Sequence, residues 1–242
     1  MTIPQSNTKP KHGIKRKKNL AKIKQREKVK SMEKIEKKND AVTFEVVFVG
    51  RSNVGKSTLL NKLTGEHVRT GKRPGVTLKP THLYYDDFLI TDMPGFGFME
   101  GVTEEKAEDV KTGIVEYIEK NADRIRIAVQ VIDGPAFEEI TKRWEERNEI
   151  PIDLELHQFL LEMEVVPIIA ANKMDKVKEE EKDSVLDNIA KRFGYMPPWK
   201  ECGAAIVPVG ARAGDIRSLI SHLKNEFHKM KRDDLFKHLK QL

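Results

Sequence analysis

At 242 residues the chain is long enough to bury a sizeable core, and its hydrophobic fraction of 38% suits a globular fold. The apolar run at residues 165–171 is far too short to span a bilayer, and no apolar core follows the N-terminal charges, so neither a membrane span nor a secretory signal is expected. The single cysteine, Cys202, lacks a partner for a disulfide or a metal site, which favours a reducing, cytoplasmic setting.

The charge of the chain is unevenly distributed. Residues 1–40 contain fourteen Lys or Arg and four Asp or Glu, a net charge of +10; the whole chain carries +6, so residues 41–242 carry −4. Scattered apolar positions in residues 15–38 predict disorder or a charged helix. A solubilising tail and an arm for RNA or another polyanion both fit. Because the tail has no aromatic residue, such binding should be salt-sensitive and poor in sequence specificity.

From residue 41 onward, short apolar segments alternate with amphipathic ones, which predicts a second part, 41–242, folded as one α/β domain. In chain order we expect strand 44–49, helix 57–63, strands 82–85 and 88–91, helix 104–121, strand 127–132, helical stretch 136–163 broken near Pro151, strand 165–171, helix 184–193, strand 204–209 and helix 215–230. The pattern predicts a mostly parallel six-stranded sheet with one antiparallel edge strand and helices on both faces. The carboxyl ends of the parallel strands would then form one ligand-binding edge.

A glycine-rich loop, GRSNVGKST at residues 50–58, stands between the first expected strand and the first helix. The pattern GxxxxGK[ST] in this context predicts a phosphate-binding P-loop. Gly50 and Gly55 let backbone N–H groups face an anion, Lys56 can reach the β- and γ-phosphates, and the hydroxyl of Ser57 can bind Mg²⁺.

Further pieces of a nucleotide site follow other strands. In DMPGFG, residues 92–97, Asp92 can hold Mg²⁺ through water, and the N–H of Gly95 can sense a γ-phosphate. Between this motif and the glycine loop lies GKRPGVTLKP, residues 71–80, whose Thr77 is the best candidate for a second Mg²⁺ ligand.

The sequence NKMD, residues 172–175, indicates the base. The carboxylate of Asp175 can accept hydrogen bonds from guanine N1–H and N2–H₂, whereas adenine would present it with an acceptor at N1. Backbone N–H groups in Gly210-Ala211-Arg212 are placed to meet guanine O6. These motifs together predict a guanine nucleotide.

These motifs, in this order, resemble those of translation-factor-class GTPases of the TrmE–Era–EngA–EngB group. GRSNVGKST, PGVT and DMPGFGF are most similar to the EngB family, as is a single G domain with no further RNA-binding domain; the resemblance covers roughly residues 42–228. It implies nucleotide contacts from Gly50, Arg51, Ser52, Asn53, Val54, Gly55, Lys56, Ser57, Thr58, Gly75, Val76, Thr77, Leu78, Lys79, Asp92, Met93, Pro94, Gly95, Asn172, Lys173, Met174, Asp175, Val209, Gly210 and Ala211. It further implies Mg²⁺ ligation by Ser57, Thr77 and Asp92, and catalytic roles for Lys56, Thr77 and Gly95.

The resemblance implies a GTPase that serves assembly of the large ribosomal subunit and is needed for normal cell division and septation, here expected to be a monomer. Two alternatives stay open: an RNA- or protein-binding module in which GTP only gates partner binding, and a division-linked regulator that acts on protein. The sequence departs from many GTPases at Gly210, where they have Ser, and in its longer basic tail.

Hydrolysis is expected to be slow. Phe96 stands where Ras-like enzymes place the Gln that orients the attacking water, and a phenyl ring cannot make the needed hydrogen bonds. Phe96 either packs inward or presents apolar surface to a partner. Asn53 matches a residue that holds K⁺ in some relatives, so potassium can supply the missing charge; the alternative is that Asn53 only orders the loop.

Overall fold

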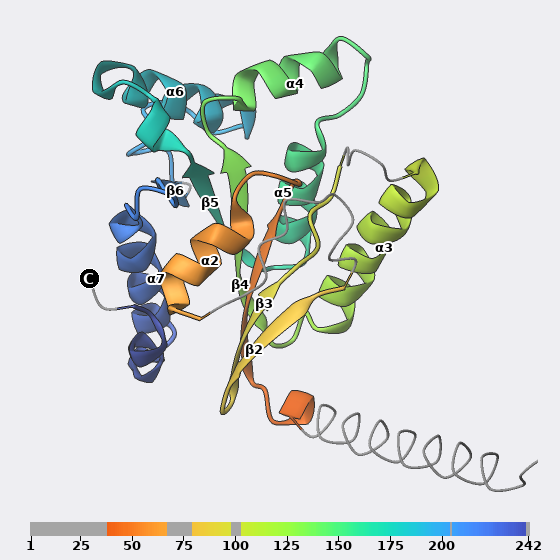
Figure 1. The fold of residues 1–242 in the computed structure, drawn as a ribbon, viewed down its shortest axis with the longest axis vertical. Helices are drawn as coiled ribbons and strands as arrows, with labels where there is room; N and C mark the ends of the chain where they lie inside the picture. The colour runs from red at the N-terminus through yellow and green to blue at the C-terminus, as the bar shows by residue number, and fades with distance from the viewer. Residues whose placement is uncertain (1–37, 67–78, 98–102, 204, 241–242) are drawn as a thin grey trace, which may run out of the picture. The chain divides into compact units, whose positions relative to one another are not determined.

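The computed structural model describes residues 38–66, 79–97, 103–203 and 205–240. Residues 43–242 form one compact unit. Its elements are β1 Phe44–Gly50, α2 Lys56–Thr64, β2 Thr81–Tyr85, β3 Phe88–Asp92, α3 Glu104–Lys120, β4 Ile125–Asp133, α4 Phe137–Glu145, α5 Ile152–Glu162, β5 Val166–Asn172, η1 Met174–Lys176, α6 Glu179–Arg192, β6 Ala205–Pro208, α7 Arg217–Lys229 and η2 Asp233–His238 (Figure 1).

The six strands form a single sheet in the order β2-β3-β1-β4-β5-β6. Only the pair β2–β3 is antiparallel, with Leu83 opposite Ile90; β1 pairs in parallel with β3 on one side and β4 on the other. The hairpin turns at Asp86, whose φ of 51° lies in the left-handed region that Asp adopts more readily than most residues. The expected six-stranded, mostly parallel sheet with one antiparallel edge strand is therefore confirmed.

The two faces of the sheet are covered by different helices, because side chains alternate along each strand. Val46 and Phe48 of β1 pack with α2 and α7, in a cluster that includes Leu60 and Phe227. Val47 and Val49 point the other way, into a cluster with residues of α3 and α5. Figure 1 shows this arrangement, with α2 and α7 on the left and α3 on the right.

Several boundaries differ from the sequence expectation. Helix α6 begins at Glu179 instead of 184, and Glu179, Glu180 and Glu181 occupy its first turn, where negative charge is stabilised by the helix dipole. Strand β4 is longer than expected at both ends, because Ile125 pairs with Glu45 of β1 and Asp133 pairs with Asn172 of β5. Strand β6 ends at Pro208, one residue earlier than expected, although Val209 still donates its N–H to the carbonyl of Ala171 in β5.

The stretch 136–163 is two helices, α4 and α5, separated by residues 146–151. Pro151 is the N-cap of α5, a position where its fixed φ is tolerated and its missing N–H removes nothing. Leu156 and Leu160 of α5 are buried against the sheet, so this stretch is partly core rather than only a solvated surface.

Candidate nucleotide-binding site

The glycine loop follows β1 directly and has the backbone that its glycines require. Gly50 and Gly55 adopt φ values of +149° and +94°. A Cβ on Gly50 would collide with the carbonyl oxygen of Val131, and one on Gly55 would collide with the side-chain amide of Asn172. Gly55 then serves as the N-cap of α2, so the positive end of that helix faces the loop. The loop geometry is therefore that of an anion-binding cradle.

Lys56, Ser57 and Asp92 meet at the carboxyl edge of the sheet. The ammonium group of Lys56 is 7% exposed and forms an ion pair with Oδ1 of Asp92 while also donating to the carbonyl of Met93. The Ser57 hydroxyl donates to Oδ2 of Asp92 at 2.7 Å. A bound phosphate would compete with Asp92 for the lysine, because both are anionic oxygen groups within reach of one ammonium.

The residues of this cluster fit a magnesium ion. Mg²⁺ prefers oxygen ligands and is held by one or two protein groups together with water and substrate phosphates. The hydroxyl of Ser57 and the carboxylate of Asp92 are two such groups in direct contact. The described residues hold no cluster of three or more His, Cys, Asp or Glu able to bind a metal alone.

The DMPG segment lies against the glycine loop. A Cβ on Gly95 would stand 2.9 Å from Oγ and 3.1 Å from N of Ser52, so only glycine fits this close approach. Ser52 donates its N–H to the carbonyl of Phe96 at 3.0 Å. Phe96 is 3% exposed and packs with residues of α3 and α5. Of the two orientations expected for this side chain, the structure therefore has the one that packs inward.

The NKMD segment joins the base end of the site to the phosphate end. Asn172 donates its amide N–H to the carbonyl of Val54 at 2.7 Å and accepts from the N–H of Ala211 at 3.0 Å. Lys173, with a φ of 67°, donates to the carbonyl of Asn53 at 3.0 Å and forms an ion pair with Asp133. The glycine loop, NKMD and residues 209–211 are thus tied into one structure.

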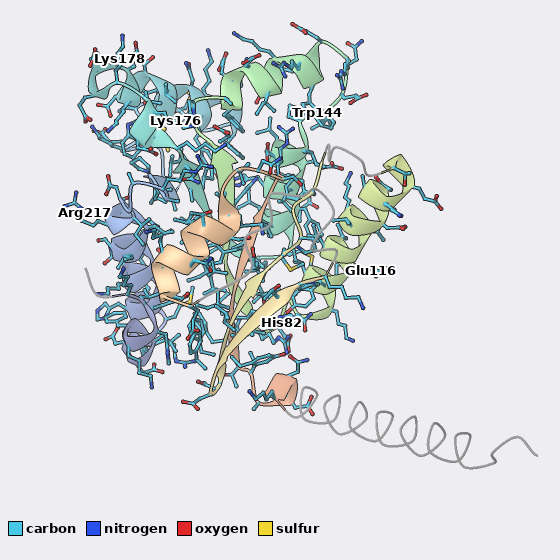
Figure 2. The ribbon with its side chains drawn as sticks, in the orientation of Figure 1. His82, Glu116, Trp144, Lys176, Lys178 and Arg217 are labelled. Atoms are coloured by element: carbon cyan, nitrogen blue, oxygen red, sulfur yellow. The ribbon has the colours of Figure 1, made fainter. Side chains whose placement is uncertain are left out.

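The carboxylate of Asp175 is exposed at this edge and is open to a base. Gly210 faces it: a Cβ there would lie 3.0 Å from both Cβ and Oδ1 of Asp175. A larger residue at 210 would therefore press on the Asp175 side chain, which would have to shift to accommodate it. Lys176 and Lys178, which follow Asp175 closely in the chain and are labelled in Figure 2, are also exposed.

Part of the expected site lies outside the described residues. This holds for Gly75, Val76, Thr77 and Leu78, and so for the second Mg²⁺ ligand; Lys79 is described and is exposed. The remaining expected residues lie together along the carboxyl ends of β1, β3 and β5 and in the loop after β6.

Sequence reasoning did not find a buried polar chain behind the glycine loop. Arg51 extends to Asp153 at the start of α5, with NH1 and Oδ2 4.0 Å apart. Gln130 donates Nε2 to the carbonyl of Asp153, and its Oε1 lies 3.1 Å from Nδ1 of His157. Nε2 of His157 lies 2.8 Å from the hydroxyl of Tyr195. The sequence signal for this set of buried polar side chains was the presence of Gln130 within the apolar strand 125–133.

Burial shifts the protonation of two groups in this chain. It raises the pKa of Asp153 to about 7, only partly opposed by the nearby charge of Arg51. It lowers the pKa of His157 to about 4. Since Gln130 Oε1 is an acceptor, Nδ1 of a neutral His157 donates to it and Nε2 accepts from Tyr195.

In the part of the chain that the structure describes, no helix is long and apolar enough to cross a membrane.

Three motifs lie at the carboxyl ends of strands in one mostly parallel sheet: a P-loop at the end of β1, an aspartate at the end of β3 and an NKxD segment at the end of β5. Together they define a GTP-binding protein of the P-loop class.

Comparison with known proteins agrees. Residues 45–173 match the family described as "50S ribosome-binding GTPase". The "Probable GTP-binding protein EngB" of Methanosarcina mazei is 57% identical over 198 residues, which is 82% of this chain and 95% of that protein. The protein of the same name from Pyrococcus abyssi is 47% identical over 188 residues, 78% of this chain and 86% of its own length. The solved structure of "a probable GTP-binding protein engB" is 46% identical, with a TM-score of 0.67 over 78% of this chain and 99% of that one. The chain belongs to the EngB family of GTP-binding proteins, and it is a GTPase.

Proposed function

We propose that this GTPase is a nucleotide switch in assembly of the large ribosomal subunit, and that normal cell division and septation depend on it through that role. The observation that supports the proposal is the match of residues 45–173 to a family described as binding the 50S ribosome. We further propose that the protein acts in the cytoplasm, as a monomer.

Different site residues would bind the phosphates and the magnesium ion. Lys56 would leave Asp92 for the β- and γ-phosphates, and the N–H of Gly95 would meet the γ-phosphate. Ser57 and Asp92, with Thr77, would hold Mg²⁺, which neutralises charge on the phosphate oxygens when bound. The same phosphate-binding cradle would also be lined by the other expected contacts, namely the remaining residues of the glycine loop, residues 75–79, Met93 and Pro94.

Asp175 would select guanine, and its amide variant tests this. Xanthine carries a carbonyl where guanine carries its 2-amino group, so Asp175→Asn should exchange an acceptor for a donor. We expect the variant to lose GDP affinity by about 100-fold or more and to gain affinity for XDP. Asp123→Asn, an exposed site at the opposite end of the sheet, serves as the control. Unchanged GDP affinity in Asp175→Asn would refute the assignment.

Intrinsic hydrolysis would be slow, because the buried ring of Phe96 offers no group to orient water. Asn53 is exposed on the glycine loop with a φ of 67°, so its side chain is accessible to a potassium ion that would add positive charge near the phosphates. Turnover is measured in KCl and in NaCl at equal ionic strength. Equal rates would refute the potassium proposal and leave the alternative that Asn53 only orders the loop.

Residues 1–40 would form a basic extension that is separate from the G domain, residues 41–242. This extension would contact ribosomal RNA through its net charge of +10. The full chain and a 41–242 truncation are sedimented with ribosomal subunits, each with GDP or a non-hydrolysable GTP analogue, at two salt concentrations. Binding to the large subunit in the GTP state supports the switch. Absence of binding in both states would instead direct the search to a protein partner in cell division.

A further inference from the structure

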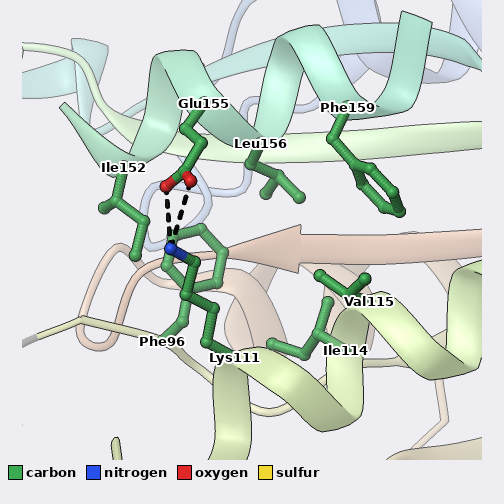
Figure 3. A pocket seen from close by; sticks show the side chains of 8 residues that line it. All are labelled: Phe96, Lys111, Ile114, Val115, Ile152, Glu155, Leu156 and Phe159. Carbon is green, nitrogen blue, oxygen red and sulfur yellow. Dashed lines mark hydrogen bonds and ion pairs between the residues drawn. The ribbon is translucent and has the colours of Figure 1, made fainter. Parts of the chain in front are cut away.

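An apolar pocket of about 120 Å³ lies between α3 and α5 (Figure 3). Phe96 lines it at the end next to the DMPG segment, Ile114 and Val115 line it from α3, and Ile152, Leu156 and Phe159 line it from α5. A cavity of roughly 150 Å³ with this kind of lining accommodates a benzene molecule. The pocket therefore has the size and chemistry for one apolar side chain. None of its lining residues is an expected nucleotide contact, although Phe96 directly follows Gly95.

One ion pair stands at the mouth of the pocket. Lys111 of α3 donates to Oε2 of Glu155 on α5 at 2.9 Å and to Oε1 at 3.2 Å, as the dashed lines in Figure 3 show. The two side chains are 36% and 51% exposed. An exposed pair of this kind adds little to stability, so it can separate to admit a ligand.

The surroundings of the mouth are acidic. Helix α3 carries six acidic and three basic residues, and α5 carries three acidic residues and no Lys or Arg. Glu108, one turn before Lys111, and Glu162, one turn after Phe159, are both exposed on the sides of the helices that line the pocket. These charges repel phosphate groups and attract Lys and Arg, which favours a basic peptide over a nucleic acid as the occupant.

We propose that this pocket is a docking site for one apolar side chain on a basic peptide segment of a partner protein. The inference goes beyond the proposed function and does not depend on it. It needs only the described G domain, so a peptide result stands whether or not ribosomal subunits bind.

The test uses a synthetic peptide of Lys and Ala residues with a single central Leu, fluorescently labelled, and the full chain loaded with GDP. A matched peptide with Ala in place of Leu, and a third with Glu in place of Lys, are the controls. We expect the Leu peptide to bind at least about tenfold more tightly than either control, because only it buries apolar area and also matches the acidic rim. It should shift the methyl NMR signals of Ile114 and Ile152.

Two protein variants complete the design. Val115→Phe fills the pocket and should weaken Leu-peptide binding about tenfold, whereas Leu161→Phe, at an exposed site on α5 that does not line the pocket, should leave it within about twofold. Equal binding of the Leu and Ala peptides, or methyl shifts confined to other regions, would overturn the proposal. The peptide comparison uses the unmodified protein, so it decides the matter even where Val115→Phe fails to fold.

Discussion

The side chain of Arg51 leaves the glycine loop and ends 4.0 Å from the carboxylate of Asp153, at the start of α5. Both side chains are largely buried, and among the described residues Nε and NH1 of Arg51 and Oδ1 of Asp153 make no hydrogen bond. Burial of charge without full hydrogen bonding is unfavourable, which is why the pKa of Asp153 rises to about 7 despite the adjacent guanidinium. The phosphate loop is therefore backed by a pair whose charge depends on pH.

Asp153 should make the protein less stable as pH rises from about 4 to 7. Its ordinary pKa is 3.8 and its folded-state pKa is about 7, so within this window the folded state binds the extra proton. The loss is about 4 kcal/mol across the window. Asp153→Asn should remove it, so the variant gains stability relative to the parent as pH rises. Urea unfolding at several pH values measures the two slopes; equal slopes would contradict the assignment.

His157 should have the opposite effect. Its ordinary pKa is 6.5 and its folded-state pKa is about 4, so the unfolded state binds the extra proton between these values and stability is lost as pH falls. The loss is about 3 kcal/mol. His157→Gln should abolish this loss, so that only the effect of Asp153 on stability remains. The parent should then show a nearly flat profile in which two opposed slopes cancel. A His157→Gln profile that matches the parent would refute this.

Glu45 should be required for stability, although it lies outside the nucleotide site. It is fully buried in β1, pairs with Nε of Arg124 at 2.8 Å, and accepts from the hydroxyl of Tyr117 at 2.7 Å. Burial and the nearby Glu45 charge raise the pKa of that tyrosine. Glu45→Gln removes a fully buried charge that both Arg124 and Tyr117 contact, and should destabilise the fold by about 3–5 kcal/mol. Glu116→Gln, at an exposed position on α3 (Figure 2), should change stability by less than about 0.5 kcal/mol.

Gly210→Ala should weaken binding of GDP by about tenfold, because its methyl group would lie 3.0 Å from Oδ1 of Asp175 and displace the carboxylate from the base. Isothermal titration with GDP measures the effect. Gly113→Ala is the matched control, since a Cβ there meets nothing within 4 Å and alanine favours the helix. If both variants bind GDP as the parent does, the approach of Gly210 to Asp175 is not important for the base.

The sequence motifs predicted the sheet, its nucleotide-binding edge and most of the site, because each motif follows a strand and parallel strands bring their carboxyl ends together. The orientation of Phe96 was left open, since a single phenylalanine after DMPG carries no information about the helices that cover it. The Arg51–Asp153 pair could not be predicted either, as it joins segments far apart in the chain. Glu45 gave a usable signal: a charged residue within an otherwise apolar strand needs a buried partner.

Asn172 has a consequence for how a nucleotide leaves. One amide holds the carbonyl of Val54 in the glycine loop and the N–H of Ala211 beside the base. When the glycine loop is ordered, the loop at Ala211 is therefore ordered as well, and the reverse also holds. Binding of the phosphates would thus prepare the site for the base, and binding of the base would prepare it for the phosphates. Free guanosine or free pyrophosphate should bind far more weakly than its share of the GDP contacts implies. Release should be a single all-or-none event, with a residence time set by the whole ligand.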